Sequence, residues 1–342
     1  MNIIVTACHV PFIFGGATHH VQGTVDGLRA LGHQVELMRF PFQFSPEKAI
    51  HDVMHFAEHL DLTRPNGQQV DRVISLQFPG YGVIHPHHTV WLMHQHRAAY
   101  ELFDASTANP EQARLRETIT AFDKRVLKRV HHRFANSPRV AERLAQFNQL
   151  EAEPLLHPPA QAEFFRCASA QPYIFYPSRL ETLKRQELLI RSAALLRSNT
   201  CIVIAGTGGQ EPMYRQLIGE LGLENRVKLL GHITDAEKIA FYAHSLGVFF
   251  GPYDEDYGYI TLEAMLSSKP VITCSDSGGP LQFVMHQDTG YVLEPDAQAI
   301  ANAIDALAEK PEKAAQMGRS GHARYQDMHI SWPHTIERLL SV

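Results

Sequence analysis

The chain has 342 residues, of which 44% are apolar and 20% charged, proportions that are usual for globular proteins. This composition argues against disordered, collagen-like and coiled-coil proteins, and the length is sufficient for two domains of ordinary size. The 31 lysines and arginines are outnumbered by 36 aspartates and glutamates, so a globally basic nucleic-acid binder is not expected.

The cysteines and the N-terminal segment indicate the compartment. Four cysteines, none in a CxxC pair, are too few for a disulfide framework and suggest a reducing compartment. The segment Met1–Ala7 has no basic residues and its apolar run stops at Cys8, so it predicts a strand rather than a signal peptide. No run of about 18 apolar residues predicts a membrane span. We therefore expect a cytoplasmic protein, with peripheral membrane contact left open.

Short Val/Ile-rich runs alternate with amphipathic segments along the first half, which is typical of βαβ units. Val21, Val25 and Leu28 have the spacing of one helix face, and Gly32 supplies a stop. The predicted strands are Ile3–Ala7, Gln34–Met38, Val73–Leu76, Val90–Met93, Arg133–Ala135 and Pro154–Leu156.

The second half repeats this rhythm. A helix is predicted through Leu189, Ala193 and Leu196, and another from an N-cap at Asp235 to His244. The predicted strands are Ile174–Tyr176, Cys201–Ala205, Val227–Leu230, Leu246–Phe250, Val271–Thr273 and Tyr291–Leu293. Three helical segments follow, from Ala297, Pro311 and Pro333.

We predict an α/β protein of two Rossmann-like, doubly wound domains, joined near Pro158–Pro172. The first spans residues 1–157, and a C-terminal helix within 326–342 packs back on it. The second spans residues 158–325.

Gly15-Gly16 lies between the first strand and the first helix. A backbone without Cβ atoms can approach a phosphate there, and the helix N-terminus offers free N–H groups. The dinucleotide fingerprint GxGxxG is absent. A purely structural turn is the alternative.

Arg179 and Lys184 follow a predicted strand end and open a helix. Ligands of open α/β sheets bind beyond the carboxyl ends of strands. A guanidinium and an ammonium group suit a diphosphate. The alternative is a solvated basic helix start, although cations there are unfavourable unless an anion compensates.

The segment 251–265 places an acidic loop before a helix that starts near Ile260, with Gly258 between them. Glu255 on the loop and Glu263 on the helix can reach different hydroxyls of one ligand. The N–H groups of Tyr259 and Ile260 then point at its phosphate. Otherwise the acids merely compensate the helix dipole.

This segment resembles the Glu-x7-Glu motif of the retaining glycosyltransferases of family 4. The match comprises Glu255, Tyr257, Gly258, Glu263, Ala264, Met265 and Pro270-Val-Ile. Further segments agree with that family in chain order: Gly15-Gly16, Phe134-Ala-Asn-Ser137, Arg179 with Lys184, Gly206-Thr-Gly208 and Leu230-Gly-His-Ile233. Two departures are Ser178, where the family commonly has glycine, and the long acidic run Asp254-Glu-Asp256.

The resemblance implies a GT-B fold, with two Rossmann-like domains facing a central cleft and a nucleotide-sugar donor on the second. It implies that Glu263 binds the ribose and Glu255 the sugar, while Arg179 and Lys184 stabilise the leaving diphosphate. No metal or other cofactor is expected, and the mechanism is same-face displacement with retention. The remaining donor-binding residues it implies are Gly15, Gly16, Gly206, Gly231, His232, Ile233, Gly258, Tyr259 and Ile260.

The 21 histidines include a cluster around one strand, formed by His85, His87, His88, His94 and His96. A zinc site there would lack any HExxH or Cys/His spacing, so hydrogen-bonded or surface histidines are the default. His94 differs because the family usually places a cleft-lining histidine at this strand end, and the resemblance implies contact with the donor sugar. Arg97 and Tyr100 then face the acceptor, or are a surface arginine and a packing tyrosine.

The segment 122–133 is basic and amphipathic, with Lys124, Arg125, Lys128, Arg129 and Arg133 among apolar residues. It suits contact with the inner face of an anionic membrane that carries a lipid-linked acceptor. A solvated helix face is the alternative.

The predicted activity is the transfer of a sugar from a nucleoside-diphosphate sugar to a glycan, glycolipid or small-molecule acceptor, in bacterial polysaccharide or glycolipid biosynthesis. A nucleotide-sugar epimerase on the same fold is a rival, since Asp254 or Asp256 can serve as acid or base. A non-catalytic sugar-nucleotide binder is a second. A pyridoxal-phosphate phosphorylase lacks a marked lysine, and a dehydrogenase lacks GxGxxG.

Overall fold

The computed structural model describes residues 1–12 and 15–341 and divides the chain into two compact units. Unit 1 comprises Met1–His157 together with the segment that begins at Ile330, and unit 2 comprises Pro158–His329. The predicted second boundary, between residues 325 and 326, is wrong by four residues. It falls in the last turn of a helix that continues to Asp327, and the chain leaves unit 2 only after that helix ends.

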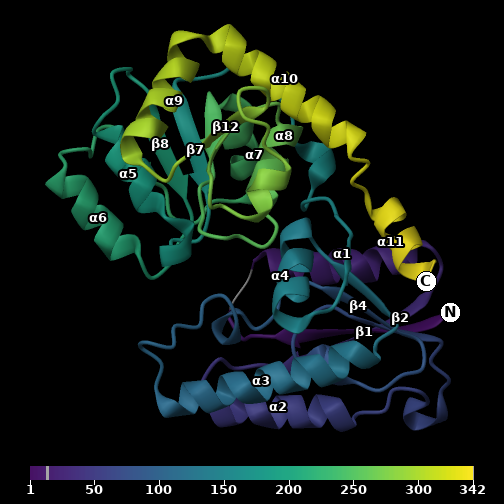
Figure 1. Cartoon of the computed structure of the whole chain (residues 1–342). Coiled ribbons are helices and arrows are strands. Elements are labelled where there is room, and N and C mark those ends of the chain that lie inside the picture. Colours follow the sequence, from purple (N-terminus) through teal and green to yellow (C-terminus); the bar gives the residue numbers. More distant parts are fainter. Residues whose placement is uncertain (13–14, 342) are drawn as a thin grey trace. The chain divides into compact units, whose positions relative to one another are not determined.

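Each unit contains a parallel six-stranded sheet (Figure 1). In unit 1 the order is β2-β1-β3-β4-β5-β6, and the strands are β1 (Asn2–His9), β2 (Gln34–Pro41), β3 (Arg72–Ser75), β4 (His88–Leu92), β5 (His132–Ala135) and β6 (Glu153–Pro154). In unit 2 the order is β12-β11-β10-β7-β8-β9, and the strands are β7 (Tyr173–Pro177), β8 (Cys201–Ala205), β9 (Val227–Leu229), β10 (Gly247–Phe249), β11 (Val271–Cys274) and β12 (Gly290–Leu293). Every predicted strand is confirmed, although β3, β4 and β6 begin and end earlier than predicted.

Helices connect these strands and cover both faces of each sheet. Unit 1 contains α1 (Gly16–Ala30), α2 (Glu47–His59), α3 (Pro110–Arg129), α4 (Pro138–Asn148) and α11 (Trp332–Leu340). Unit 2 contains α5 (Gln186–Ala193), α6 (Glu211–Glu220), α7 (Asp235–His244), α8 (Tyr259–Leu266), α9 (Ala297–Glu309) and α10 (Pro311–Asp327).

The helix starts follow local capping chemistry. Ser137 accepts a hydrogen bond from the amide of Val140 and so caps α4. The predicted N-cap of α7, Asp235, is wrong by one residue. Thr234 is the cap, because its hydroxyl accepts from the amide of Glu237 while the Glu237 carboxylate accepts from the amide of Thr234, a complete capping box.

The core of unit 1 has two layers, one on each side of its sheet. One contains Val21, Val25 and Leu28 of α1 with Ile336 and Leu339 of α11. The other contains residues of α2, α3 and α4, and α2 and α3 lie side by side in Figure 1. The predicted spacing of Val21, Val25 and Leu28 is confirmed, since all three are buried.

Two glycines of α1 make room for α11. A Cβ atom on Gly23 would lie 1.9 Å from Cζ2 of Trp332, and one on Gly27 would lie 2.8 Å from Cγ1 of Ile336. Glycines four residues apart share one face of a helix, so together they form a groove for these two side chains. The terminal segment is therefore an integral part of unit 1.

In unit 2, α5, α6 and α9 contribute to one continuous core with β7, β8 and β10, while Phe241 and Tyr242 of α7 pack on Phe175 of β7.

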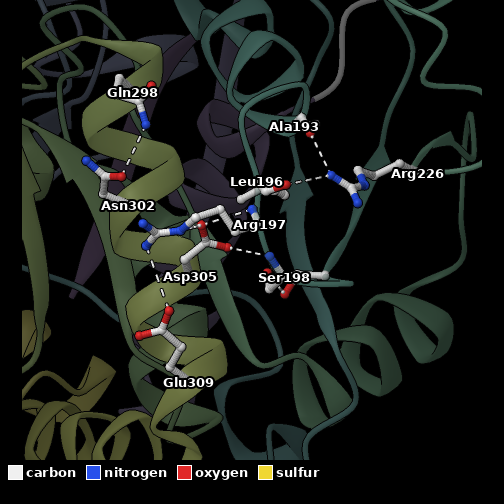
Figure 2. A network of polar contacts seen from close by, with 10 residues as sticks. Ala193, Leu196, Arg197, Ser198, Arg226, Gln298, Asn302, Asp305 and Glu309 are labelled. Carbon is white, nitrogen blue, oxygen red and sulfur yellow. Dashed lines mark hydrogen bonds and ion pairs between the residues drawn. The ribbon is translucent and has the colours of Figure 1, made fainter.

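Figure 2 shows how α9 is attached to the turn before β8: the Asp305 carboxylate accepts hydrogen bonds from the backbone amides of Arg197, at 3.1 Å, and Ser198, at 3.0 Å. Burial raises the pKa of Asp305, but these hydrogen bonds outweigh it and the pKa is lowered. The carboxylate therefore stays ionised and fixes the sheet to its helical layer.

A buried acid lies at the centre of unit 1. Asp123 of α3 is fully buried and accepts hydrogen bonds from the hydroxyls of Tyr81, at 2.7 Å, and Tyr100, at 2.6 Å. The Tyr100 hydroxyl also accepts from Nδ2 of Asn148, whose Oδ1 accepts from Gln95 at 2.5 Å. Burial raises the pKa of Asp123 to about 7, against the lowering effect of the two tyrosine hydrogen bonds.

This acid makes stability depend on pH. Folded Asp123 keeps its proton up to about pH 7, whereas an unfolded chain loses it near about pH 4. Unfolding therefore releases a proton between these values, and stability falls as the pH rises through them. We expect the Tm of Asp123→Asn minus that of the wild type to grow between pH 5 and pH 8, in thermal melts. An exposed control, Asp52→Asn, should show no such trend, and a constant difference for Asp123→Asn would contradict the assignment.

Among the described residues, no helix is both long enough and apolar enough to cross a bilayer.

Candidate active site

The chain order of the unit 2 sheet reverses between β7 and β10, since β8 and β9 lie on one side of β7 and β11 and β12 lie beyond β10. Such a switch point leaves a crevice at the carboxyl ends of the two strands, which is where open α/β sheets bind ligands. The loop after β7 carries Arg179 and Lys184, and the loop after β10 carries Glu255. The predicted site residues Arg179 and Lys184 therefore lie at the same edge of the sheet as Glu255, which is far from them in the sequence.

Three loops at this edge are joined through their backbones. The amide of Ser178 donates to the carbonyl of Ala205, and that of Leu180 donates to the carbonyl of Thr207. Gly206 donates to the carbonyl of Gly231 at 2.7 Å, which adds the loop after β9. The segments that carry Arg179, Gly206 and Gly231 thus form one continuous layer.

Glycine is required at two positions of this layer. Gly206 has a φ of +130°, and a Cβ atom there would lie 2.0 Å from the carbonyl oxygen of Ser178. A Cβ atom on Gly208 would lie 2.4 Å from the carbonyl oxygen of Leu180. Both contacts are with the backbone on either side of Arg179, so these glycines set the position of that arginine. Its side chain is exposed and has no ion pair among the described residues.

Lys184 and Glu255 form an ion pair across the switch point, with 2.5 Å between Nζ and Oε2. The side chains are 17% and 21% exposed. The ammonium group also lies 5.8 Å from the centre of the Phe250 ring. Two residues predicted to hold different parts of a donor thus form an ion pair with each other.

Arg185 was not among the predicted site residues, although it follows Lys184 directly. Its guanidinium group makes two hydrogen bonds to the Asp276 carboxylate, at 2.8 and 2.6 Å. It also donates to the carbonyls of Gly251, at 2.9 Å, and Pro252, at 2.7 Å. Arg185 therefore connects the loops that follow β7, β10 and β11. The acidic residue Asp276, just beyond the predicted strand 271–273, could have indicated a partner for Arg185.

Backbone contacts also fix the acidic loop. The amides of Asp254 and Glu255 donate to the carbonyls of Asp276 and Ser277, both at 2.9 Å, and the Glu255 carbonyl accepts from Gly279 at 2.7 Å. Gly278 has a φ of +72°, and a Cβ atom there would lie 2.6 Å from that carbonyl. The run Asp254-Glu-Asp256, a departure from the family pattern, is therefore an ordered segment.

Glu263 of α8 is buried and has two partners on α7. Lys238 donates to Oε1 at 3.0 Å, and the Tyr242 hydroxyl donates to Oε2 at 2.6 Å. Burial would lower the pKa of Lys238, but the Glu263 charge outweighs it and the pKa is raised. The sequence analysis missed both partners, although their spacing of four residues on one helix face was a usable signal.

The remaining predicted residues of unit 2 lie at element ends. Gly258 caps α8 with a φ of +92°, and Tyr259 and Ile260 begin that helix, where N–H groups have no partner within the helix. The loop between β9 and the cap of α7 contains Gly231, exposed His232 and half-buried Ile233.

The predicted residues of unit 1 follow β1 and β4. Gly15 caps α1, with nothing within 4 Å of the position of its missing Cβ atom, and Gly16 begins the helix. His94 is half-buried and its Nδ1 lies 2.7 Å from the carbonyl of Gln95.

Arg97 and Tyr100 have internal partners. Arg97 pairs with Glu101, which also pairs with Arg143, and Tyr100 belongs to the buried network around Asp123. Their loop nevertheless lines a cavity of about 260 Å³ through Ala98, Leu102 and Phe103, opposite Phe44.

The clustered histidines of unit 1 have structural partners. His85 contacts the carbonyl of Val70 and the amide of His87, and His88 contacts the Ser75 hydroxyl at 2.7 Å. Burial lowers the pKa of His88 to about 3 and that of His96 to about 4. Residues 1–12 and 15–341 contain no group of three or more histidine, cysteine, aspartate or glutamate side chains placed to hold a metal ion.

Three arginines of the basic segment have internal partners. Arg125 pairs with Glu58, Arg129 donates to the carbonyls of Gly82 and Val83, and Arg133 donates to carbonyls that include those of Leu127 and Val130. Lys124 and Lys128 are exposed.

Unit 2 is similar to known proteins. The family model described as "Glycosyl transferases group 1" matches residues 161–324, which is nearly all of that unit. The alpha-1,3/1,6-mannosyltransferase ALG2 of Mus musculus is 36% identical over 110 residues, which are 32% of this chain and 26% of the mouse protein. The chain thus matches about a quarter of the length of that relative.

Solved structures resemble the whole chain. A sucrose-phosphate synthase from Thermosynechococcus elongatus has a TM-score of 0.81 at 17% identity, covering 99% of this chain and 97% of that one. Anabaena HepE, solved in complex with UDP-glucose, has a TM-score of 0.74 at 18% identity, covering 100% and 98%. At these identities the likeness establishes the arrangement of strands and helices.

Proposed function

We propose that the chain is a group 1 glycosyltransferase, since the model of that family matches residues 161–324, and that it transfers a sugar from a nucleoside-diphosphate sugar to a hydroxyl acceptor. The predicted GT-B fold, with two Rossmann-like domains, is confirmed by the two parallel six-stranded sheets and by their match to solved structures. The transfer is proposed to retain the anomeric configuration and to need no metal ion.

The observation that carries this proposal is the set of charges at the switch point of unit 2. A cation and a carboxylate, Lys184 and Glu255, meet there, and Arg179 lies exposed on the adjoining loop. Fixed cations bind a diphosphate, and a carboxylate accepts strong hydrogen bonds from sugar hydroxyls. One edge of the sheet offers both.

Each group has a proposed role. Arg179 and Lys184 stabilise the negative charge that develops on the departing diphosphate, together with the N–H groups that begin α8. Glu263, which is paired with Lys238, accepts hydrogen bonds from the ribose hydroxyls. Gly231, His232 and Ile233 contact the base, and His94 contacts the sugar. The HepE complex with UDP-glucose supports a donor of this class.

The acceptor is proposed to be a glycan, a glycolipid or a small molecule. The cavity of about 260 Å³ beside Leu102 and Phe103 is the proposed acceptor pocket, because it follows the same strand as His94. A membrane-borne acceptor would meet a face where Lys124 and Lys128 remain exposed.

A thermal-shift panel of UDP, GDP, ADP, CMP and NAD, with and without EDTA, tests the donor assignment. A ligand that binds the folded state alone raises the Tm. We expect one nucleoside diphosphate to do so regardless of EDTA, and its sugar derivative to be consumed. Arg179→Ala should lower donor turnover at least tenfold without changing the Tm, because this side chain is exposed. Arg191→Ala, an exposed arginine on α5, is the matched control.

Other outcomes would favour the rivals. A Tm shift with NAD alone, or a drop in Tm caused by EDTA alone, would contradict the proposal. Isomerised nucleotide sugar formed without any acceptor would indicate an epimerase. Nucleotide binding without turnover across a broad range of acceptors would indicate a binding protein.

A further inference from the structure

We propose that Glu255 makes this site select the sugar-bearing donor over the free nucleoside diphosphate, because it competes with the diphosphate for Lys184. The inference rests on the proposed function, since it concerns the same ligand. The quantity at issue is the difference between the affinity for the donor and the affinity for the product, which the proposed contacts with the donor do not determine.

The Lys184–Glu255 pair is unlike an ordinary surface pair. Its side chains are 17% and 21% exposed, whereas those of the surface pair Lys48–Asp52 are 79% and 62% exposed. Exposed pairs are weakened by solvent and by the entropy of ordering two long side chains. A pair that is largely withdrawn from water interacts more strongly, and separating it leaves two poorly solvated charges.

The backbone holds both partners in place. The carbonyl of Lys184 accepts a hydrogen bond from the buried Tyr176 hydroxyl at 2.5 Å. Glu255 is bonded on both sides, through its amide to Ser277 and through its carbonyl to Gly279, and it forms a bridge with Gly278. The ordering of these segments is therefore already complete before a ligand arrives.

Competition follows from the charges. In the free protein the charge of Lys184 is neutralised by Glu255, so a free nucleoside diphosphate must open the pair. The displaced carboxylate then lies beside a second anion, without compensation. When a sugar is attached, its hydroxyls donate to the displaced carboxylate and offset this loss.

The same contacts act in reverse after transfer. Once the sugar has left, Glu255 has no hydroxyl partners and returns to Lys184, which weakens the hold on the remaining diphosphate. Glu255 thus favours binding of the donor and release of the product.

The test is the affinity of Glu255→Gln for UDP, GDP and ADP and for their glucose derivatives, measured by calorimetry on the full chain. For the nucleotide that binds the wild type, we expect the free diphosphate to bind at least tenfold tighter and the ratio of donor to product affinity to fall. In a Lys184→Met background the same substitution should give a smaller gain, because only the repulsion between the Glu255 carboxylate and the diphosphate is then left to relieve. Glu181→Gln is the matched control. Glu181 lies on the same loop as Lys184, but its carboxylate makes no ion pair among the described residues.

The outcomes separate this inference from the proposed function. If neither the wild type nor any variant binds a nucleotide of the panel, the proposed function fails. If the wild type binds one and Glu255→Gln binds it equally or more weakly, the competition is contradicted while the proposed function stands. An equal gain from Glu181→Gln, or an undiminished gain without Lys184, would also overturn it.

Discussion

Replacing Glu263 by glutamine is expected to weaken nucleotide binding by at least about tenfold and to lower the free energy of unfolding by about 3 kcal/mol. The substitution keeps the shape of the side chain but removes the nearer and more buried of the two carboxylates that pair with Lys238, the other being Asp235 at 3.6 Å. Breaking a largely buried ion pair by removing one partner costs about 3 to 5 kcal/mol. The ribose hydroxyls also lose their charged acceptor, and a hydrogen bond to a charged group is worth about 1.5 to 3 kcal/mol.

A double variant separates the two effects. With Lys238→Met added to Glu263→Gln, the largely buried ammonium group is removed as well, only the exposed Asp235 loses a partner, and Tyr242 can still donate to the glutamine oxygen. We expect denaturant unfolding to show most of the stability restored, while calorimetry still shows the weakened nucleotide binding. Wild-type affinity in Glu263→Gln would remove the ribose role from this residue. Failure of Lys238→Met to restore stability would show that the loss has another cause.

Replacing Gly208 by alanine is expected to destabilise unit 2 by at least 2 kcal/mol, whereas the same change at the adjacent Gly209 should stay within about 0.5 kcal/mol. A Cβ atom at position 208 meets the Leu180 carbonyl at 2.4 Å, but one at position 209 has nothing within 4 Å. The obstacle at position 208 is backbone and cannot rotate away. Gly206→Ala should be at least as severe, because it adds an unfavourable φ of +130° to a contact of 2.0 Å.

The variant of these two glycines that loses stability should also lose nucleotide affinity. The displaced backbone is that of residues 178–180, so Gly208→Ala should also weaken binding of the nucleoside diphosphate through Arg179. Urea unfolding and calorimetry on Gly208→Ala and Gly209→Ala provide the comparison. Equal behaviour of the two variants would mean that the layer of loops yields easily and does not position Arg179.

The strands were predictable because buried parallel strands are continuous apolar runs, such as Cys201–Ala205, whose ends agree with the sequence prediction. Lys184 and Glu255 could be assigned to one edge because the carboxyl ends of parallel strands share an edge. The contact between them, however, depends on backbone positions that are held by hydrogen bonds with Tyr176 and Ser277, which no local pattern reveals.

Other features depended on tertiary structure in the same way. Thr234 and Asp235 are both good caps, and only the reciprocal contact with Glu237 decides between them. Arg179 and Arg185 belong to the same basic run, yet Asp276 engages the second alone. Tyr100 follows a strand end, as a ligand-binding residue does, but its hydroxyl is engaged within the protein by Asp123 and Asn148.

The return of the chain to unit 1 at Ile330 has a consequence for biosynthesis. Trp332 and Ile336 fill the groove at Gly23 and Gly27, and Leu339 lies in the same core, so this layer contains residues from both ends of the sequence. A ribosome makes the sheet of unit 1 first and all of unit 2 before it makes α11. Unit 1 therefore exposes an incomplete apolar face throughout the synthesis of unit 2, until α11 has been made. Of the two units, the first is the one that would most depend on chaperones during translation.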